Sequence, residues 1–426
     1  MSSTMKKKPT PAAIPAARVQ AHRLLGLVLT EKCTLDEALA QLPLAGAEAD
    51  QRFAMLLVLT TLQHLGQLDA LLAAYLTKPL PPKRLTITNA LRLGAAQLLL
   101  LNTPAHAAVN ETVALVKNGK DAGLAGLVNA VLQKIANDRP ALPAAIHNIP
   151  AWLRARWEAQ YGAEAVASIA QVASQRTPLD LNSTVEMEGA ERLDAQMLRF
   201  TGEHPPVEQL PGYADGAFFV QDIAASYPVR LLGEVRELQV LDVCAAPGGK
   251  TMQLIRAGAF VTALDRSAPR MRVVKANLKR MGMEANTIVA DALAWESRRA
   301  YDAILLDAPC TASGTARHHP EMMAILSESE ITEMAALQRQ FLSRAWGWLK
   351  PGGVMVYSVC SLEPEEGEQQ VAWFLGEHAD AVVASIPASS GIPAECVTGN
   401  FLRTLPSHLA ERSGMDGFFA VALRKH

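Results

Sequence analysis

Leu238-Gln239-Val240-Leu241-Asp242-Val243-Cys244-Ala245-Ala246-Pro247-Gly248-Gly249-Lys250 joins an apolar run to a loop with two adjacent glycines. The run at 238–243 predicts a β-strand, and the pattern at 252–257 predicts that a helix follows the loop. Gly248 and Gly249 carry no Cβ, so the backbone can approach a ligand closely where that helix begins. The segment therefore predicts a nucleotide-type ligand site at the edge of an α/β sheet.

The remainder of the chain after residue 236 repeats this alternation of apolar strands and helices. Further strands are predicted at 260–264, 287–290, 303–306, 354–357 and 418–423, with helices at 270–281 and 330–349. Strands that are apolar on both sides are typical of a mainly parallel sheet covered on both faces. We expect an α/β Rossmann-like domain at 236–426.

The first part of the chain has a different pattern. Amphipathic helical stretches follow one another from residue 16 to about 140, and Thr34-Leu35-Asp36-Glu37 forms a capping box. Prolines at 140, 143 and 150 indicate a linker. We predict a disordered basic tail at 1–15, an all-helical domain at 16–140 and a small α/β connector at 151–235.

Composition limits the class of protein. The chain has 426 residues, of which 50% are hydrophobic and 19% charged, which is typical of a multidomain globular protein. The longest apolar runs, such as 55–59, fall far short of the roughly 20 residues that span a bilayer. No signal peptide follows the N-terminal lysines, because residues 9–17 alternate proline, alanine and one isoleucine. We therefore expect a cytoplasmic protein without a membrane span.

The charge distribution and the cysteine content limit the kinds of partner and of site that the chain can have. Residues 1–150 carry 15 Lys and Arg against 9 Asp and Glu, whereas the whole chain has a net charge of −2. A basic N-terminal domain on a mildly acidic chain indicates an anionic partner such as RNA. The five cysteines include no Cys-x-x-Cys pair, so the sequence predicts neither a disulfide framework nor a metal site.

Acidic residues follow the next two strands of the predicted sheet. Asp265 ends the second strand, where a carboxylate can accept hydrogen bonds from both hydroxyls of a ribose, and Asp291 ends the third, on the adenine side. The loop at 244–250 has neither the Gly-x-Gly-x-x-Gly spacing of dinucleotide binders nor the glycine spacing of a P-loop. Nicotinamide and triphosphate chemistry are therefore disfavoured.

Two cysteines follow two further strands. Cys310 lies in Asp307-Ala308-Pro309-Cys310 and Cys360 in Ser358-Val359-Cys360-Ser361. Carbon 5 of a pyrimidine is a poor nucleophile until a thiolate adds at carbon 6, and Asp307 could hydrogen-bond ring nitrogen 3 and the exocyclic amine during that addition. The pattern predicts an S-adenosylmethionine-dependent cytosine methyltransferase. Cys33 and Cys396 are interpreted as buried small hydrophobes, and Cys244 as part of the loop scaffold.

Single-stranded or looped RNA presents a target base more cheaply than a duplex does. Two groups of basic residues near the predicted site could contact the RNA phosphates. The first group is Arg266, Arg270, Arg272, Lys275, Lys279 and Arg280, and the second is Arg317, His318 and His319. A solvated helix face explains the first group equally well.

At these motifs the chain resembles the RNA cytosine-5 methyltransferases of the Sun/Fmu (RsmB-type) family, and its helical part resembles the NusB-like RNA-binding domain. The shared motifs also include the segments at 216–222 and 416–419. The resemblance implies a class I methyltransferase domain with a mainly parallel seven-stranded sheet. The chain departs from the family pattern at Val359, where threonine is common, at Thr311, where serine is common, and at His318, where a second arginine is typical.

The resemblance also implies roles for single residues. Cys360 matches the nucleophile, and Cys310 matches the cysteine that assists release of the methylated base. Contacts to S-adenosylmethionine carry over to Cys244, Ala245, Ala246, Pro247, Gly248, Gly249, Lys250, Asp265, Asp291 and Asp307. The implied substrate is a specific cytosine in small-subunit (16S) ribosomal RNA, and the implied state is a monomer.

Other functions stay open at this point. DNA cytosine methyltransferases use the cysteine of a Pro-Cys motif, which would nominate Cys310, but Cys360 and the helical domain argue against DNA. An amino-group methyltransferase needs no thiol. The remaining alternatives are a cytosine-5 methyltransferase of another RNA and a non-catalytic RNA-binding or ribosome assembly factor.

Overall fold

The computed structural model describes residues 16–426 and divides into two compact units, one ending at Leu153 and one beginning at Arg154. The predicted basic tail at 1–15 lies outside the described residues. Each unit has its own hydrophobic core.

The first unit is all-helical, as the sequence predicts. Helix α5 is its central element, because it packs against α1, α3, α4, α6 and α7 and is buried along most of its length. The capping box is present, with the Thr34 side chain accepting from the Glu37 amide and the Glu37 carboxylate accepting from the Thr34 amide. The helices are α1 (Ala16–Glu31), α2 (Leu35–Gln41), α3 (Glu48–Gln63), α4 (Leu65–Tyr75), α5 (Leu85–Leu99), α6 (Ala105–Lys117) and α7 (Ala125–Asp138).

Within residues 16–426, no single helix is both long and apolar enough to cross a bilayer. Only α3 and α4 taken together reach that length and composition, and they are bent by 77° at the break between them.

Helices α8 (Ala151–Tyr161) and α9 (Ala163–Ala173) precede a small antiparallel sheet with the strand order β2-β3-β1-β4. Its strands are β1 (Leu179–Ser183), β2 (Glu191–Arg192), β3 (Met197–Phe200) and β4 (Phe218–Val220). The sequence predicts strands at 179–182 and 216–220, which correspond to β1 and β4, but not β3, because Arg199 interrupts its apolar pattern. In the structure Arg199 is fully buried and forms two hydrogen bonds with Asp180 on the neighbouring β1, at 2.6 and 2.7 Å.

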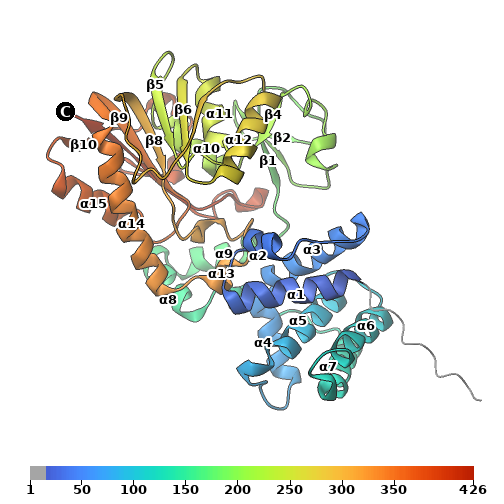
Figure 1. Ribbon diagram of the computed structural model, residues 1–426. Helices are drawn as coiled ribbons and strands as arrows, with labels where there is room; N and C mark the ends of the chain where they lie inside the picture. The colour runs from blue at the N-terminus through green and yellow to red at the C-terminus, as the bar shows by residue number, and fades with distance from the viewer. Residues whose placement is uncertain (1–15) are drawn as a thin grey trace, which may run out of the picture. The chain divides into compact units, whose positions relative to one another are not determined.

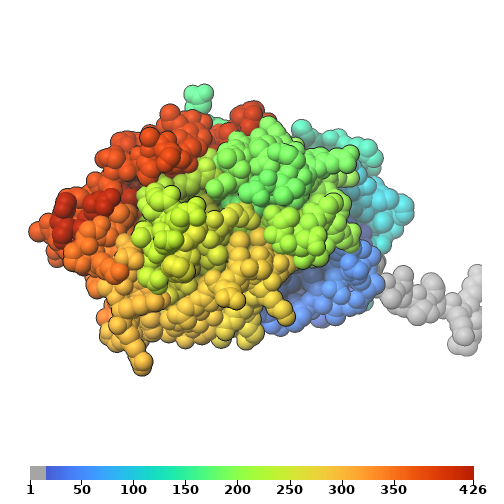
Figure 2. Space-filling view, turned by 90° about the horizontal axis from the view of Figure 1, so that it is seen from above, coloured from blue at the N-terminus to red at the C-terminus, as the bar shows by residue number. Residues whose placement is uncertain are grey.

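The small sheet packs against the helices that follow it. Arg280 of α12 (Ala268–Arg280) donates to the carbonyl oxygens of Tyr213 and Phe218 at 2.9 and 3.0 Å. Arg256 of α11 (Gly249–Arg256) donates to the Asn182 side chain at 2.5 Å. Figure 2 shows the green surface of this region beside the yellow-green surface of the segment that follows it. The small sheet is therefore attached to the larger sheet through α11 and α12.

The second sheet contains nine strands in the order β11-β12-β13-β9-β8-β5-β6-β7, with β10 paired to β13. Strands β5 to β9 are mutually parallel, and β13 joins β9 in antiparallel orientation. The strands are β5 (Gln239–Val243), β6 (Phe260–Asp265), β7 (Asn286–Val289), β8 (Tyr301–Asp307), β9 (Leu349–Val359), β10 (Ala381–Val383), β11 (Val397–Thr398), β12 (Phe401–Thr404) and β13 (Phe418–Lys425).

Helices cover both faces of this sheet (Figure 1). Ile304 and Leu306 of β8 point to the face covered by α14 (Glu328–Gly347) and α15 (Glu368–Glu377), whereas Ala303 and Leu305 point to the face covered by α10 (Ile223–Arg230) and α11 (Gly249–Arg256). Helix α12 (Ala268–Arg280) packs beside α11, and the short α13 (Met322–Ile325) follows β8. The Rossmann-like prediction is therefore confirmed.

The predicted strand number is wrong, since the sheet has nine strands rather than seven. The unpredicted strands β10, β11 and β12 are three, two and four residues long. Segments this short offer too little alternation to predict a strand. In the fold β10 and β12 pair with the antiparallel β13, and β11 pairs with β12.

Candidate active site

The glycine loop turns sharply at the end of β5. Cys244 has a left-handed φ of 62° and Gly248 one of 105°, a conformation that favours glycine. A Cβ on Gly248 would lie 3.2 Å from a methyl carbon of Val274 in α12, so the loop and that helix approach closely. Arg270 of the same helix donates to the Ala246 carbonyl oxygen at 2.6 Å, which holds the loop in place.

Asp265 and Asp291 lie at the ends of neighbouring parallel strands, as predicted. The Asp265 carboxylate accepts from the amides of Ala246 and Ser267 at 3.1 and 2.8 Å, so it fastens the glycine loop to the end of β6. Asp291 is exposed and accepts from the Leu293 amide at 3.0 Å. Both carboxylates keep further acceptor capacity.

A cavity of about 250 Å³ lies at this edge of the sheet. It brings together Asp265, Asp291, Asp307, Cys310 and Cys360, which are candidate residues from four separate segments of the sequence. The full lining is Cys244, Ala246, Leu264, Asp265, Arg266, Arg270, Ala290, Asp291, Ala292, Asp307, Ala308, Pro309, Cys310, Ala312, Phe341 and Cys360. The other loop residues Ala245, Pro247, Gly249 and Lys250 line an adjacent hollow that shares Asp307. Gly248 lines neither space.

The two cysteines meet inside this cavity. Strands β8 and β9 are parallel neighbours, and the Sγ atoms of Cys310 and Cys360 lie 3.4 Å apart. The hydrogen bond with Cys360, together with burial, raises the pKa of the Cys310 thiol well above its usual range. Cys310 is therefore held as a neutral thiol that can donate to the sulfur of Cys360.

Asp307 faces the same cavity with its carboxylate fixed from two sides. Oδ2 accepts from Lys250 Nζ at 2.8 Å, and Oδ1 accepts from Ser358 Oγ at 2.8 Å. Burial lowers the pKa of Lys250, but the Asp307 carboxylate outweighs that effect and raises it, so Lys250 is charged. The Asp307 side chain is still 30% exposed, which leaves it accessible to a ligand.

The remaining cysteines lie outside this arrangement of two thiols. Cys396 is fully buried, as predicted, and Cys33 is half-buried in the first unit. Cys244 lines the cavity as part of the loop, and burial raises its pKa, which argues against a reactive thiolate there.

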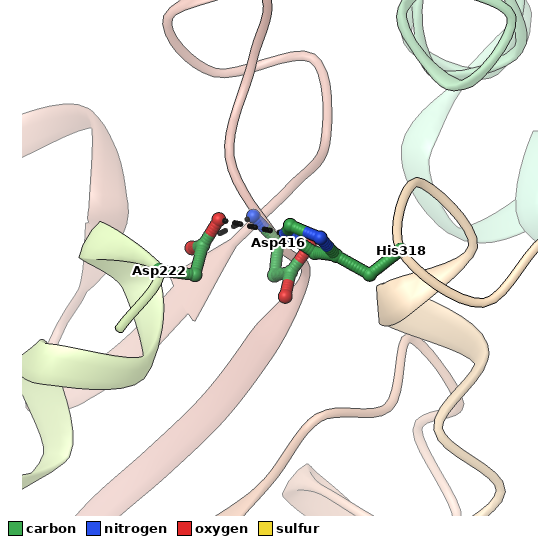
Figure 3. Close-up of side chains that lie close together, drawn as sticks. All are labelled: Asp222, His318 and Asp416. Carbon is green, nitrogen blue, oxygen red and sulfur yellow. Dashed lines mark hydrogen bonds and ion pairs between the residues drawn. The ribbon is translucent and has the colours of Figure 1, made fainter. Parts of the chain in front are cut away.

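A cluster of charged side chains lies near the Cys310 loop (Figure 3). Arg317 forms ion pairs with Asp222, at the start of α10, and Asp416, before β13, at 3.2 and 3.5 Å. Figure 3 shows that His318 also points toward both carboxylates, at 3.5 and 3.6 Å. Two aspartates and one histidine are side chains that could hold a metal ion, but the Arg317 guanidinium already contacts both carboxylates. We interpret the cluster as an ion-pair network.

Asp222 and Asp416 had no predicted role, although both lie in motifs that the chain shares with the family it resembles. One feature of the sequence could have revealed this cluster: two motifs each carry an acidic residue, and a third segment carries Arg317 and His318. The proposed phosphate contacts must also be corrected, because Arg317 is 4% exposed and inside this cluster, whereas Arg280 donates to backbone carbonyls. The exposed basic residues of α12 are Arg270, Arg272, Lys275 and Lys279, of which Arg270 is already bonded to the glycine loop.

Two family models match the chain. The model described as 16S rRNA methyltransferase RsmB/F matches residues 229–424, and the model of the NusB family matches residues 15–137.

Similar proteins extend these matches to nearly the whole chain. Ribosomal RNA small subunit methyltransferase B of Sodalis glossinidius is 34% identical over 417 residues, which span 89% of this chain and 94% of that protein. The crystal structure of PH0851 covers 98% of this chain and 100% of its own, with a TM-score of 0.74 and 23% identity. The structure of NSun6 from Pyrococcus horikoshii with SFG covers 65% of this chain and 98% of its own, with a TM-score of 0.57 and 20% identity. The two solved structures show a shared fold.

Proposed function

Because the chain belongs to the family of ribosomal RNA small subunit methyltransferase B, we propose that it methylates carbon 5 of a specific cytosine in small-subunit (16S) ribosomal RNA. The observation that carries the proposal is the meeting of Cys310 and Cys360 in the cavity that also contains Asp265, Asp291 and Asp307. A cofactor pocket and a thiol nucleophile share one space, which methylation of a pyrimidine carbon requires.

S-adenosylmethionine is the cofactor, and when bound it supplies a methyl group on a positively charged sulfur. The lining of the cavity fits such a molecule, because carboxylates from the ends of β6, β7 and β8 face it. Asp265 would hold the ribose and Asp291 would lie on the adenine side. The loop at 244–250 would contact the rest of the cofactor through its backbone.

Cys360 is the nucleophile in this proposal. Its sulfur forms a bond with carbon 6 of the cytosine, and the displaced electron pair makes carbon 5 nucleophilic. After carbon 5 is methylated and its proton has passed to a base, the bond between sulfur and carbon 6 breaks. The neutral Cys310 thiol, 3.4 Å away, donates a hydrogen bond to the departing thiolate and so assists release.

Asp307 orients the base. Lys250 and Ser358 fix its carboxylate at the cavity, each at 2.8 Å. A carboxylate in that place can accept from the exocyclic amine of cytosine and lies near ring nitrogen 3, where charge shifts during addition.

The RNA partner explains the domain organisation. The helical domain at 16–140 matches the NusB family model and lies within the basic first 150 residues, so it would bind RNA. The connector at 151–235 and the methyltransferase domain at 236–426 would form the catalytic part. Exposed Arg272, Lys275 and Lys279 of α12 would contact phosphates near the target base. We expect a cytoplasmic monomer.

The test is incubation of the purified chain with unmodified small-subunit ribosomal RNA and methyl-labelled S-adenosylmethionine, followed by nucleoside analysis. The proposal expects label in 5-methylcytidine for the wild type and for the control Cys33→Ala, whose thiol lies in the first unit. Label that appears only with another RNA would favour the alternative substrate. Cofactor binding without any label, on naked RNA and on small-subunit particles, would favour the assembly factor.

A further inference from the structure

Glu366 is a fully buried carboxylate between Cys360 and α15. Its Oε2 accepts from the Thr311 amide and from Gln338 Nε2, at 2.9 and 2.8 Å. Its Oε1 accepts from Ser361 Oγ at 2.6 Å and from the Thr311 hydroxyl. Four donors from three segments therefore converge on one side chain.

The positions of these donors are specific. Thr311 directly follows Cys310, and Ser361 directly follows Cys360. Gln338 of α14 also donates to the carbonyl oxygen of Pro309, on the other side of Cys310, at 2.9 Å. One carboxylate thus links the residues next to both thiols.

The backbone of Glu366 is anchored as well. Its carbonyl oxygen accepts from the hydroxyl of Tyr357, a fully buried residue of β9, at 2.6 Å. The backbone of Glu366 is consequently held against the strand that Cys360 directly follows.

Hydrogen bonds alone compensate the buried charge. None of the ion pairs found among residues 16–426 includes Glu366. Burial raises the pKa of Glu366, and the hydrogen bonds from Ser361 and Thr311 offset this rise only in part. Because all four partners donate, the group that satisfies them is an acceptor-only carboxylate. The departure at Thr311 keeps the hydroxyl that a serine would supply.

We propose that Glu366 is a positioning residue that holds the Cys310 and Cys360 loops together and sets the separation of the two sulfur atoms. The consequence for catalysis rests on the proposed function, because the sulfur separation matters for release of the methylated base. The geometric part of the proposal does not depend on that function.

Glu366→Gln tests the role with little change in volume. The amide group replaces one acceptor by a donor, so at least one of the four donors loses its partner. The control is Glu363→Gln on the same loop, a buried carboxyl bonded to Trp157 and Arg156 instead of the cysteine loops.

The first readout is binding of phenylarsine oxide, which measures thiol proximity without RNA or cofactor. Arsenic forms bonds to both sulfurs, and the two thiol protons leave with the arsenical oxygen as water. Peptide mapping should find arsenic bridging Cys310 and Cys360 in the wild type and in Glu363→Gln. Glu366→Gln should bind at least about tenfold more weakly, since each 1.4 kcal/mol is a factor of ten.

The second readout is methyl transfer. Glu366→Gln should lower kcat about 10- to 100-fold with KM and cofactor affinity nearly unchanged, because misplacement of a reacting group by about 1 Å can cost 100-fold. Unchanged arsenical binding would overturn the proposal, as would weakened binding with an unchanged kcat. Weakened arsenical binding in a protein whose wild type methylates no RNA would keep the geometric role and reject the proposed function.

A second pair of variants tests the same role in case Glu366→Gln does not fold. Thr311→Val removes one donor at similar volume, whereas Thr311→Ser keeps the hydroxyl. The proposal expects weakened arsenical bridging in the first and wild-type bridging in the second. Equal bridging in both variants would overturn it.

Discussion

Asp307 and Ser358 are partners in the register of the adjacent parallel strands β8 and β9, and their side chains are joined by a 2.8 Å hydrogen bond. This pairing fixes how the two loops leave the sheet. Cys310 lies three residues after Asp307 and Cys360 two residues after Ser358, and their sulfur atoms come within 3.4 Å. The convergence of the thiols therefore originates in strand register.

Cys310→Ala should trap a covalent protein–RNA complex. The Cys360 thiolate would still add to the base, but its departure would lose the hydrogen bond that the Cys310 thiol donates at 3.4 Å. The measurement is an RNA-protein band that survives denaturation in the presence of S-adenosylmethionine. A variant that turns over as fast as the wild type, with no such band, would contradict the assigned role.

Asp307→Asn should lower kcat by about 100-fold, because a neutral amide accepts more weakly from the exocyclic amine and loses the ion pair with Lys250, and one preorganised polar group at a reacting centre is typically worth at least that much. Ser358→Ala leaves the carboxylate but removes its 2.8 Å hydrogen bond, so a loss of about tenfold or less is expected. The measurement is single-turnover methyl transfer with saturating RNA. Equal losses in the two variants would argue against a direct contact between Asp307 and the base.

Stability should depend on pH through His318. Burial lowers the pKa of His318, but the carboxylates of Asp416 and Asp222 outweigh it and raise the pKa to about 9 from 6.5. A raised pKa means that protonated His318 stabilises the fold fully below about pH 6.5, and that this contribution is lost as the pH rises through about 9.

His318→Gln should therefore lower the free energy of unfolding by about 0.5–1 kcal/mol near pH 6 and by less near pH 9.5, a small effect for a partly exposed pair. The side chain is 36% exposed, so solvent screens the charges. His318→Arg stays protonated over this range and should remove the dependence. Denaturant titration at both pH values measures this, and a difference that grows with pH would contradict the assignment.

Gly314 lies where the backbones of two motifs touch. A Cβ there would be 2.1 Å from the Gly417 carbonyl oxygen, whereas a Cβ on Gly347 in α14 would meet nothing within 4 Å. Gly314→Ala should cost about 1–3 kcal/mol of stability through overpacking. Gly347→Ala should be neutral or stabilising by up to about 1 kcal/mol. Equal melting temperatures for the two variants would contradict this prediction, because they would mean that the loop shifts to accommodate the added methyl group.

The sequence predicted the parts of the fold that local patterns encode. Strands β5, β6 and β8 are mainly apolar runs, and each was predicted within two residues of its observed ends. Strand β9 begins at Leu349, five residues before the predicted start, because Lys350-Pro351-Gly352-Gly353 breaks the apolar pattern there. Its pairing with β8 includes a register irregularity at that end, and only the neighbouring strand determines it.

The candidate site also has a part that the sequence predicts and a part that only the fold reveals. Acids and cysteines placed directly after strands could be selected from sequence, since parallel strands bring their carboxyl ends to one edge. The roles of Glu366 and Arg317 could not, because Thr311 precedes Glu366 by 55 residues and Asp222 precedes Arg317 by 95. Charged residues with such distant partners look like solvated surface until the fold joins them.

The most direct test asks which sulfur bonds to the base. RNA containing 5-fluorocytidine at the target position cannot lose a proton from carbon 5, so the wild-type protein should remain attached to it after methyl transfer. Mass spectrometry of the digested complex would identify the modified cysteine, with Cys360→Ala as the control. The account predicts RNA on the Cys360 peptide and no complex with Cys360→Ala. RNA attached to Cys310 would contradict it.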